Sequence, residues 1–207
     1  MLVKYLEKGI NFIIKNNHQV WNIIKFKYYG SQIIFPNGIG RSIINGVVYI
    51  RLRKTGKLII GDNFRCVSGH CYNPIARNIR TTFCTEENAI IEIGNNVGIS
   101  SSSLWAFNKI TIGNNVNIGA DCIIMDSDAH SLNYKDRREG KLDKLNRKTS
   151  SIVIKDDVLI GTRSIILKGV TIGERSIIGA GSVVTCNIPP DEIWAGNPAK
   201  CVKKLIK

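Results

Sequence analysis

The sequence has few of the residues that tie a chain together covalently or through a metal ion. It holds six cysteines without a Cys-x-x-Cys pair, three histidines and five prolines, and aromatic residues make up only 7%. No apolar run reaches the length of a membrane-spanning helix. No secretory signal is visible, because Lys4, Glu7 and Lys8 interrupt the start. These absences predict a cytoplasmic protein with reduced thiols.

Acidic residues are also scarce, 16 against 29 lysines and arginines, so the formal net charge is +13. That charge suits a polyanion, a membrane surface or an anionic cofactor. The 207 residues are enough for one domain, and 43% hydrophobic with 22% charged residues is typical of a globular chain. The 35 isoleucines and 13 valines far outnumber the 11 leucines and 8 alanines, which favours strands over helices.

One apolar residue recurs at every sixth position over the C-terminal part of the chain. The run comprises Ile154, Ile160, Ile166, Ile172, Ile178 and Val184. Glycine follows three of these residues, at positions 161, 173 and 179. A small or apolar residue also lies four positions after each apolar residue of the run: Val158, Ser164, Val170, Ser176, Ser182 and Ile188. This regularity indicates a structural repeat.

The same period appears upstream in shifted phase, in blocks at 112–124, 93–99 and, more weakly, 60–66. A period of six matches neither a helix, at about 3.6 residues, nor a single strand, at about 2. It fits a chain that forms a short strand, turns a corner and repeats, so that three faces close a triangular coil. Stacked coils lie about 4.8 Å apart, with the apolar position inside and small residues at the corners. The period therefore predicts a parallel β-helix.

The end of the repeat carries the most specific motifs. Ile178-Gly-Ala-Gly-Ser-Val-Val-Thr is followed by Pro189-Pro190 and by Ala195-Gly-Asn-Pro-Ala-Lys200. Over about residues 58–204 the chain resembles the hexapeptide-repeat acyltransferases, in particular the short sugar O-acetyltransferases similar to maltose, galactoside and colanic-acid acetyltransferases. The resemblance implies a left-handed parallel β-helix, an exception to the right-handed crossover rule. It also implies acetyl-CoA as co-substrate and a homotrimer with sites between subunits.

Two segments do not follow the repeat. Residues 126–150 form a charged stretch between hexads and are predicted to be a loop ejected from a coil. Residues 1–57 mix apolar and basic residues and predict a helix or two, which either cap the first coil or contact an anionic membrane; capping is favoured. The expected organisation is an N-terminal segment (1–57), a β-helix (58–190) and a basic C-terminal tail (191–207).

Acetyl transfer to a hydroxyl needs a base for the proton and a group that stabilises the oxyanion. His18 lies in the N-terminal segment, His70 lies on an early coil with no clear role, and His130 begins the ejected loop. The resemblance implies that His130 is the catalytic base. Asp126 or Asp128 would hold its imidazole tautomer, or both belong to a surface turn; the sequence does not decide between these roles.

The resemblance also implies the cofactor contacts. The residues expected along the pantetheine arm are Gly161, Thr162, Gly179, Ala180 and Thr185. A backbone amide near Thr162 would polarise the thioester, and Lys200 and Lys203 match basic positions that meet the phosphates. The chain departs from the family pattern at Cys186, where a lysine is frequent, and at Trp194, where a small residue is usual. Trp194 either stacks on adenine or covers the last coil.

Serine hydroxyls are the candidate ligands of the acceptor. The run from Ser100 to Ser103 is predicted to lie on a coil next to His130, so Ser101 and Ser102 are expected to bind acceptor hydroxyls. The alternative, favoured by their size, is that they fill corners of the coil.

The resemblance thus implies an acetyl-CoA-dependent O-acetyltransferase that transfers acetyl directly to a sugar hydroxyl of a surface polysaccharide or its lipid-linked precursor. N-acetylation of an aminosugar stays open as an alternative, and a non-enzymatic β-helix scaffold is disfavoured because no polar motif repeats on one face. A zinc enzyme like the γ-class carbonic anhydrases is disfavoured because the three histidines lack ligand spacing, so no metal is expected. No nucleic-acid recognition motif accompanies the positive charge.

Overall fold

The structure is a computed structural model, which describes residues 17–69, 71–77 and 79–205. Its strands are short and form three sheets. The first sheet contains β1 (Ile33–Ile34), β4 (Lys57–Ile60), β7 (Ile90–Ile93), β10 (Lys109–Ile112), β13 (Ile152–Ile154) and β16 (Thr171–Ile172). The second contains β2 (Ile43–Asn45), β5 (Arg65–Val67), β8 (Gly98–Ser100), β11 (Asn117–Ile118), β14 (Leu159–Ile160), β17 (Ile177–Ile178), β19 (Glu192–Gly196) and β20 (Ala199–Lys204). The third contains β3 (Tyr49–Leu52), β6 (Thr82–Thr85), β9 (Ser103–Ala106), β12 (Ile123–Met125), β15 (Ile165–Ile166) and β18 (Val183–Val184).

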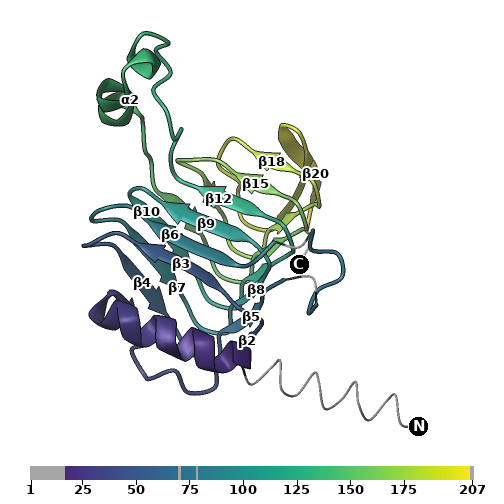
Figure 1. Cartoon of the computed structure of the whole chain (residues 1–207). Coiled ribbons are helices and arrows are strands. Elements are labelled where there is room, and N and C mark those ends of the chain that lie inside the picture. Colours follow the sequence, from purple (N-terminus) through teal and green to yellow (C-terminus); the bar gives the residue numbers. More distant parts are fainter. Residues whose placement is uncertain (1–16, 70, 78, 206–207) are drawn as a thin grey trace.

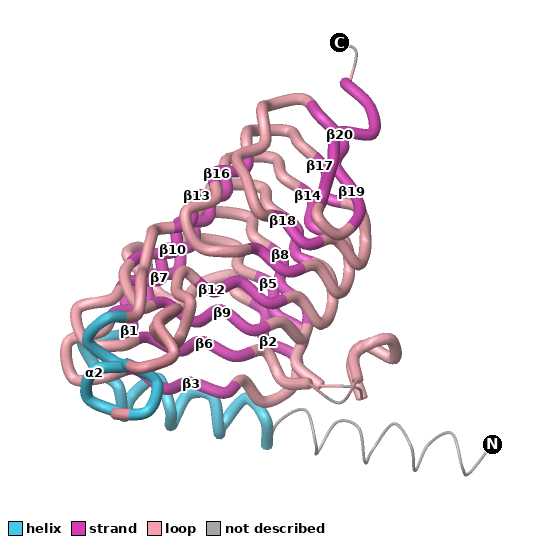
Figure 2. Tube along the Cα trace, turned by 90° about the horizontal axis from the view of Figure 1, so that it is seen from above, coloured by secondary structure: helices cyan, strands magenta, loops and turns pink. Residues whose placement is uncertain are grey.

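From β4 to β18, each strand pairs in parallel with the third strand before it. The chain therefore visits the three sheets in turn and rises by one coil per circuit, as Figure 2 shows along the stack. The result is a left-handed parallel β-helix, as the hexads and the resemblance predicted. We call the turns from the first to the second sheet the first corner, from the second to the third the second corner, and from the third to the first the third corner.

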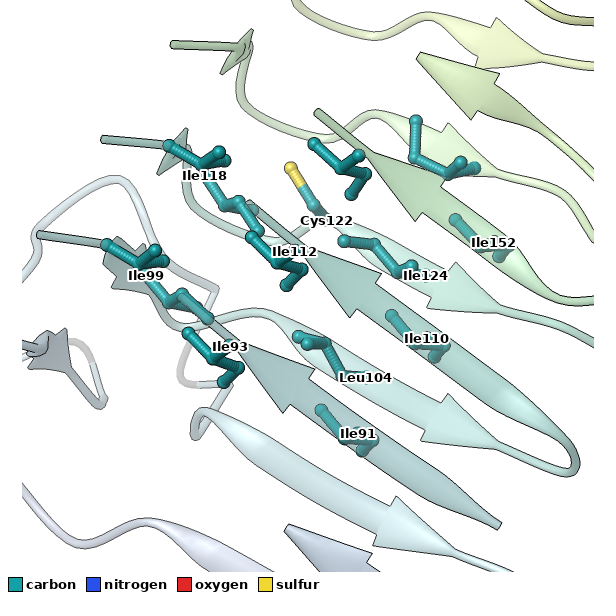
Figure 3. Packing of buried hydrophobic residues seen from close by; sticks show 14 of the residues in the cluster. Ile91, Ile93, Ile99, Leu104, Ile110, Ile112, Ile118, Cys122, Ile124 and Ile152 are labelled. Carbon is teal, nitrogen blue, oxygen red and sulfur yellow. The ribbon is translucent and has the colours of Figure 1, made fainter. Parts of the chain in front are cut away.

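The hexad isoleucines form the core of this prism. Ile110 pairs with Ile91 on one side and Ile152 on the other, so identical side chains stack along the axis. All three are fully buried, and Figure 3 shows them pointing into the space between the sheets. Each buried isoleucine stabilises the fold by about 1.5–3 kcal/mol, which accounts for the excess of β-branched residues.

Asparagines shape the first corner. Asn63, Asn96 and Asn115 have φ of 56°, 57° and 57°, a left-handed conformation that asparagine adopts more readily than other side chains. They stack, because the Nδ2 of Asn63 donates to Asn96 Oδ1 and the Nδ2 of Asn96 to Asn115 Oδ1, each at 3.0 Å. These stacked asparagines therefore form a ladder that keeps successive coils in register.

The coils begin earlier than the sequence predicted. β1, β2 and β3 pair with β4, β5 and β6, so the first coil starts at Ile33 and not near residue 58. Residues 17–29 form a helix that lies across this coil (Figure 1), followed by the 3-10 helix η1 (Gly30–Gln32). At the other end, the predicted C-terminal tail forms the antiparallel hairpin of β19 and β20.

Two excursions leave the coils: a loop over 68–81 between β5 and β6, and the predicted ejected loop between β12 and β13. The second protrudes from the third corner (Figure 1) and carries the 3-10 helix η2 (Asp136–Arg138) and helix α2 (Gly140–Asn146). Within the described residues no helix has the length and apolarity needed to cross a bilayer.

Candidate active site

The ejected loop has a closed neck at the third corner. The N–H of Asp128 donates to Lys148 O and the N–H of Ser150 to Asp126 O, both at 3.0 Å. The chain therefore leaves and re-enters the prism as a pair of hydrogen-bonded strands, and the residues beyond the neck fold on one another. His130 lies two residues past Asp128, just beyond this neck.

His130 is held by a carboxylate from helix α2. Its Nδ1 lies 2.6 Å from Asp143 Oδ2, and the other oxygen of Asp143 accepts the N–H of Ser131 at 2.8 Å. Asp143 is buried, whereas the His130 side chain is 69% exposed. The ring is therefore fixed along one edge and open to solvent on the other.

The charge of Asp143 determines which imidazole nitrogen is free. The hydrogen bonds from His130 and from the Ser131 amide lower the pKa of Asp143 below its usual value, so it is a carboxylate at neutral pH and can only accept. Neutral His130 must then carry its proton on Nδ1 and present the lone pair of Nε2 outward. This is the protonation state that a general base needs.

Neither aspartate predicted to orient His130 does so. Asp126 is fully buried at the third corner, where its two oxygens accept the N–H groups of Phe107 at 2.6 Å and Asn108 at 2.9 Å. Burial raises the pKa of Asp126, and these backbone bonds oppose the rise. Asp126 thus closes the turn from β9 to β10, and the expectation that it orients His130 is not met because both oxygens are occupied.

Asp128 forms an ion pair with the next coil, which contains β15. Its Oδ1 lies 2.7 Å from the Nζ of Lys168, which follows β15 at the third corner. The pair anchors the neck to the prism, so the second predicted orienting residue acts on the loop and not on the imidazole. Asp143, which does contact the ring, is thirteen residues from His130 in sequence.

Backbone amides that lack a hydrogen-bond partner within the described residues line the second corner, and those of Thr162 and Ala180 are among them. The N–H groups of Thr162 and Ala180 make no hydrogen bond within the described part of the chain, although their neighbours Gly161, Arg163 and Gly179 all donate along the stack. Glycine leaves room here, because a Cβ on Gly161 would lie 2.5 Å from the Ala180 nitrogen. Successive coils therefore present a line of open donors about 4.8 Å apart.

Serines lie beneath the same corner and not on its surface. Ser101 and Ser102 are both fully buried. The Ser102 hydroxyl donates to Gly119 O at 2.7 Å, and the Ser101 hydroxyl accepts the N–H of Gly69 at 3.1 Å. The prediction that they bind an acceptor is therefore wrong in this structure, and they fill the corner, as do Ser164 and Ser182 on later coils.

The remaining expected cofactor residues fall in two places. Lys200 and Lys203 are exposed on β20, and Lys200 pairs with Ala195, which stacks over Gly179. The second corner therefore leads to Lys200, and Lys203 lies further along β20, opposite Ile193. Trp194 packs against the core and its Nε1 donates to Glu192 at 2.7 Å, so it covers the last coil. Thr185 follows β18 and is exposed at the third corner.

His18 lies apart from this arrangement, whereas the buried thiol of Cys122 belongs to the second corner, where its Sγ lies 3.2 Å from Gly161 O. His18 contacts the hydroxyl of Tyr72 at 3.1 Å, and His70 lies outside the described residues. Burial raises the pKa of Cys122 and raises that of Cys66 to about 12, which disfavours a thiolate nucleophile at either position. In the part of the chain that the structure describes, no three His, Cys, Asp or Glu side chains are grouped for a metal ion.

Comparison with known families agrees with this geometry. The family model described as bacterial transferase hexapeptide (six repeats) matches residues 151–186, and the hexapeptide repeat of succinyl-transferase matches 109–125. The chain belongs to the hexapeptide-repeat acyltransferase family. Both matches fall on coils, and between them lies the excursion that carries His130 and Asp143.

Several relatives share this hexapeptide-repeat sequence. A putative acetyltransferase of Schizosaccharomyces pombe is 46% identical over 96 residues, 46% of this chain and 44% of that protein. Galactoside O-acetyltransferase of Escherichia coli K12 is 33% identical over 141 residues, 61% of this chain and 66% of that enzyme. The chain thus spans about half the length of the first of these curated relatives.

The fold recurs in AntD, an N-acyltransferase from Bacillus cereus whose crystal structure contains dTDP and 3-hydroxybutyryl-CoA. The two chains superpose with a TM-score of 0.59 over 88% of this chain and 87% of that chain, at 19% identity. At this identity the likeness concerns the fold alone.

Proposed function

We propose that this hexapeptide-repeat protein is an acetyl-CoA-dependent O-acetyltransferase that acts on a sugar hydroxyl. The observation that carries the proposal is the His130–Asp143 pair, whose carboxylate leaves Nε2 free to accept a proton. The resemblance to galactoside O-acetyltransferase favours a sugar hydroxyl as the acceptor. In the proposed setting, the enzyme works in the cytoplasm on a surface polysaccharide or its precursor.

In the proposed reaction His130 Nε2 removes the proton of the acceptor hydroxyl. The oxygen forms a bond to the thioester carbonyl carbon, and the carbonyl oxygen becomes an oxyanion. The carbon–sulfur bond then breaks, CoA leaves, and the protonated His130 returns its proton to the thiolate. The transfer is direct, so no covalent acyl-enzyme is needed.

The second corner supplies the proposed cofactor site. The open N–H groups of Thr162 and Ala180 would bind the polar groups of the pantetheine arm and the oxyanion, because a fixed amide donor needs no reorganisation as charge develops. The line of donors leads to Lys200 and Lys203, whose ammonium groups would pair with the phosphates. We also assign Thr185, which lies at the third corner, a contact with the cofactor.

The location of these two halves supports a site shared between chains. His130 extends from the third corner, whereas Thr162 and Ala180 lie at the second corner, at the opposite end of the third-sheet strands. A neighbouring copy related by a threefold axis would place its second corner against the His130 loop. We therefore assign a homotrimer in which each site takes its base from one subunit and its thioester-binding amides from the next.

The direct test is acetyl transfer by purified His130→Ala protein, measured as thiol release from acetyl-CoA with a panel of sugars. The variant should lose at least about 100-fold in kcat, since general-base catalysis contributes roughly 10²–10⁴, while CoA binding by calorimetry stays unchanged. His18→Gln is the matched control and should retain full activity, because His18 lies on the N-terminal helix against Tyr72. Full transfer by His130→Ala contradicts the mechanism, and transfer to amino sugars alone contradicts the hydroxyl acceptor.

Mixing two inactive variants tests the shared site. His130→Ala removes the base, and Ala180→Trp places a bulky side chain on the exposed second corner. If sites form between subunits, trimers reassembled from equal amounts should contain both intact halves in about a quarter of their sites. If each site lies within one chain, every chain in the mixture lacks one half and no activity returns.

A further inference from the structure

The helix over 17–29 is fixed to the first coil by polar groups on its inner side. Asn22 Nδ2 donates to Gly46 O at 2.9 Å, the Lys25 ammonium to Val48 O at 2.6 Å, and the Tyr29 hydroxyl to Ile50 O at 2.9 Å. These bonds satisfy carbonyls at the open end of the prism. They also fix the rotation of the helix, because turning it would leave those carbonyls without partners.

The outer side of the same helix is apolar and aromatic. Val20, Trp21, Ile24 and Tyr28, the outer helix face, have relative exposures of 55%, 58%, 50% and 82%. The apolar surface continues past Ile23 into a groove of about 370 Å³ between the helix and the first coil. Large apolar side chains on the solvent side of a short helix mark an interaction surface.

The segment that contains this helix and the first coil carries charge of one sign in sequence, although Arg51 and Arg53 pair with Glu86 on the next coil. Between Glu7 and Asp62 the sequence contains no acidic residue, and it contains these basic ones: Lys8, Lys15, Lys25, Lys27, Arg41, Arg51, Arg53, Lys54 and Lys57. Most of the net charge of +13 therefore falls on the N-terminal end of the chain. In Figure 1 the helix, in purple, lies across this end of the prism, on the side away from β20.

We propose that the outer helix face docks on an anionic lipid bilayer. Tryptophan and tyrosine favour the interface between hydrocarbon and water, and a helix with apolar and basic residues lies in that plane. A second copy of the chain is the poorer partner, because self-pairing of this end would bring like charges together. Anionic headgroups instead neutralise them, and each basic residue near the surface strengthens binding about fivefold.

This surface rests on the proposed function, since it would hold the enzyme beside acceptors that are linked to lipid. The two can be tested separately. Acetyl transfer to a soluble sugar needs no vesicle, and vesicle binding needs no acetyl-CoA. Failure of one assay therefore leaves the other interpretable.

The test is co-sedimentation of the full chain with vesicles of phosphatidylcholine, with and without phosphatidylglycerol. The chain should bind the anionic vesicles and should release them at high salt. The triple variant Trp21→Ser, Ile24→Ser, Tyr28→Ser should lower the partition coefficient at least about tenfold, because three apolar side chains no longer enter the interface. Ile75→Ser removes an apolar side chain that is 56% exposed on the 68–81 loop, and should bind as the wild type does.

A charge variant supports the test if the triple variant does not fold. Lys27→Gln leaves the apolar face intact and should weaken binding to anionic vesicles about fivefold without affecting phosphatidylcholine vesicles. Undiminished binding by the triple variant overturns the proposal, as does equal binding to both kinds of vesicle. If the triple variant has a smaller oligomer mass than the wild type in lipid-free solution but still binds vesicles, the outer helix face contacts a second copy of the chain. That result would also overturn the proposal.

Discussion

Replacing Asp143 with asparagine changes the hydrogen bond to His130 without changing the shape of the side chain. The backbone N–H of Ser131 donates to one oxygen of Asp143 at 2.8 Å, so the amide oxygen of the variant must keep that position. The amide nitrogen then faces the Nδ1 of His130, 2.6 Å from the present carboxylate oxygen. Because NH₂ can only donate, Nδ1 must be deprotonated and the proton must move to Nε2.

The proposed base would then carry a proton on the atom that should accept one. General-base catalysis contributes roughly 10²–10⁴ to the rate, which sets the upper limit of the loss. The imidazole is 69% exposed, so it can turn away from the amide and recover the active tautomer part of the time. We therefore expect kcat to fall about 10- to 100-fold, less than for His130→Ala, with CoA affinity unchanged.

The assay is steady-state thiol release from acetyl-CoA with the confirmed acceptor, together with calorimetric CoA binding. Asp136→Asn is the matched control, because Asp136 lies in the same excursion and bonds to Ser131 Oγ and Asn146 but not to His130. It should change kcat by less than about threefold. The reasoning is refuted if Asp143→Asn keeps its kcat within twofold of the wild type, or if the control loses as much.

Two further predictions concern the corners. Gly161→Ala would place a Cβ 2.5 Å from the Ala180 nitrogen, so it should weaken CoA binding at least about tenfold by calorimetry, whereas Gly140→Ala, with open space around it, should not. For Asp126, whose pKa burial raises above 3.8, protonation favours the folded state, so its contribution to the free energy of unfolding is greatest below pH 3.8 and is lost as pH rises through the raised pKa. Urea unfolding between about pH 3.5 and 7 should show that the free energy of unfolding of the wild type falls relative to that of Asp126→Asn as pH rises. A difference between the two proteins that does not change with pH contradicts this prediction.

The coils were predictable because their cause is local and repeated. An isoleucine at every sixth position and a glycine beside it define strand, corner and inward face at once. The first coil was missed because extra residues between β1 and β2 break this spacing and leave only Ile44 and Ile50 six residues apart. The pairing of β1, β2 and β3 with β4, β5 and β6 reveals the coil. Sequence period detects a coil only where no residues are inserted between its strands.

The candidate site was predictable in part. His130 could be singled out because it begins the ejected loop and the resemblance points to it, but its partner Asp143 lies thirteen residues away on a short helix. That pairing depends on how the excursion folds, which the repeat does not specify. For Ser101 and Ser102 the sequence leaves two roles open, acceptor binding and the favoured filling of a corner. Their burial and hydrogen bonds show that they fill the corner.

The closed neck makes the folding of the coils independent of the excursion between them. The loop leaves after β12 and returns before β13, and these flanking coils still pair directly with their neighbours, Ile112 with Ile154 and Ile124 with Ile166. The prism therefore does not register how long the excursion is or what it contains. If the proposed function holds, exchanging the segment between these two coils would change the acceptor site and leave the proposed donor site on the coils unchanged.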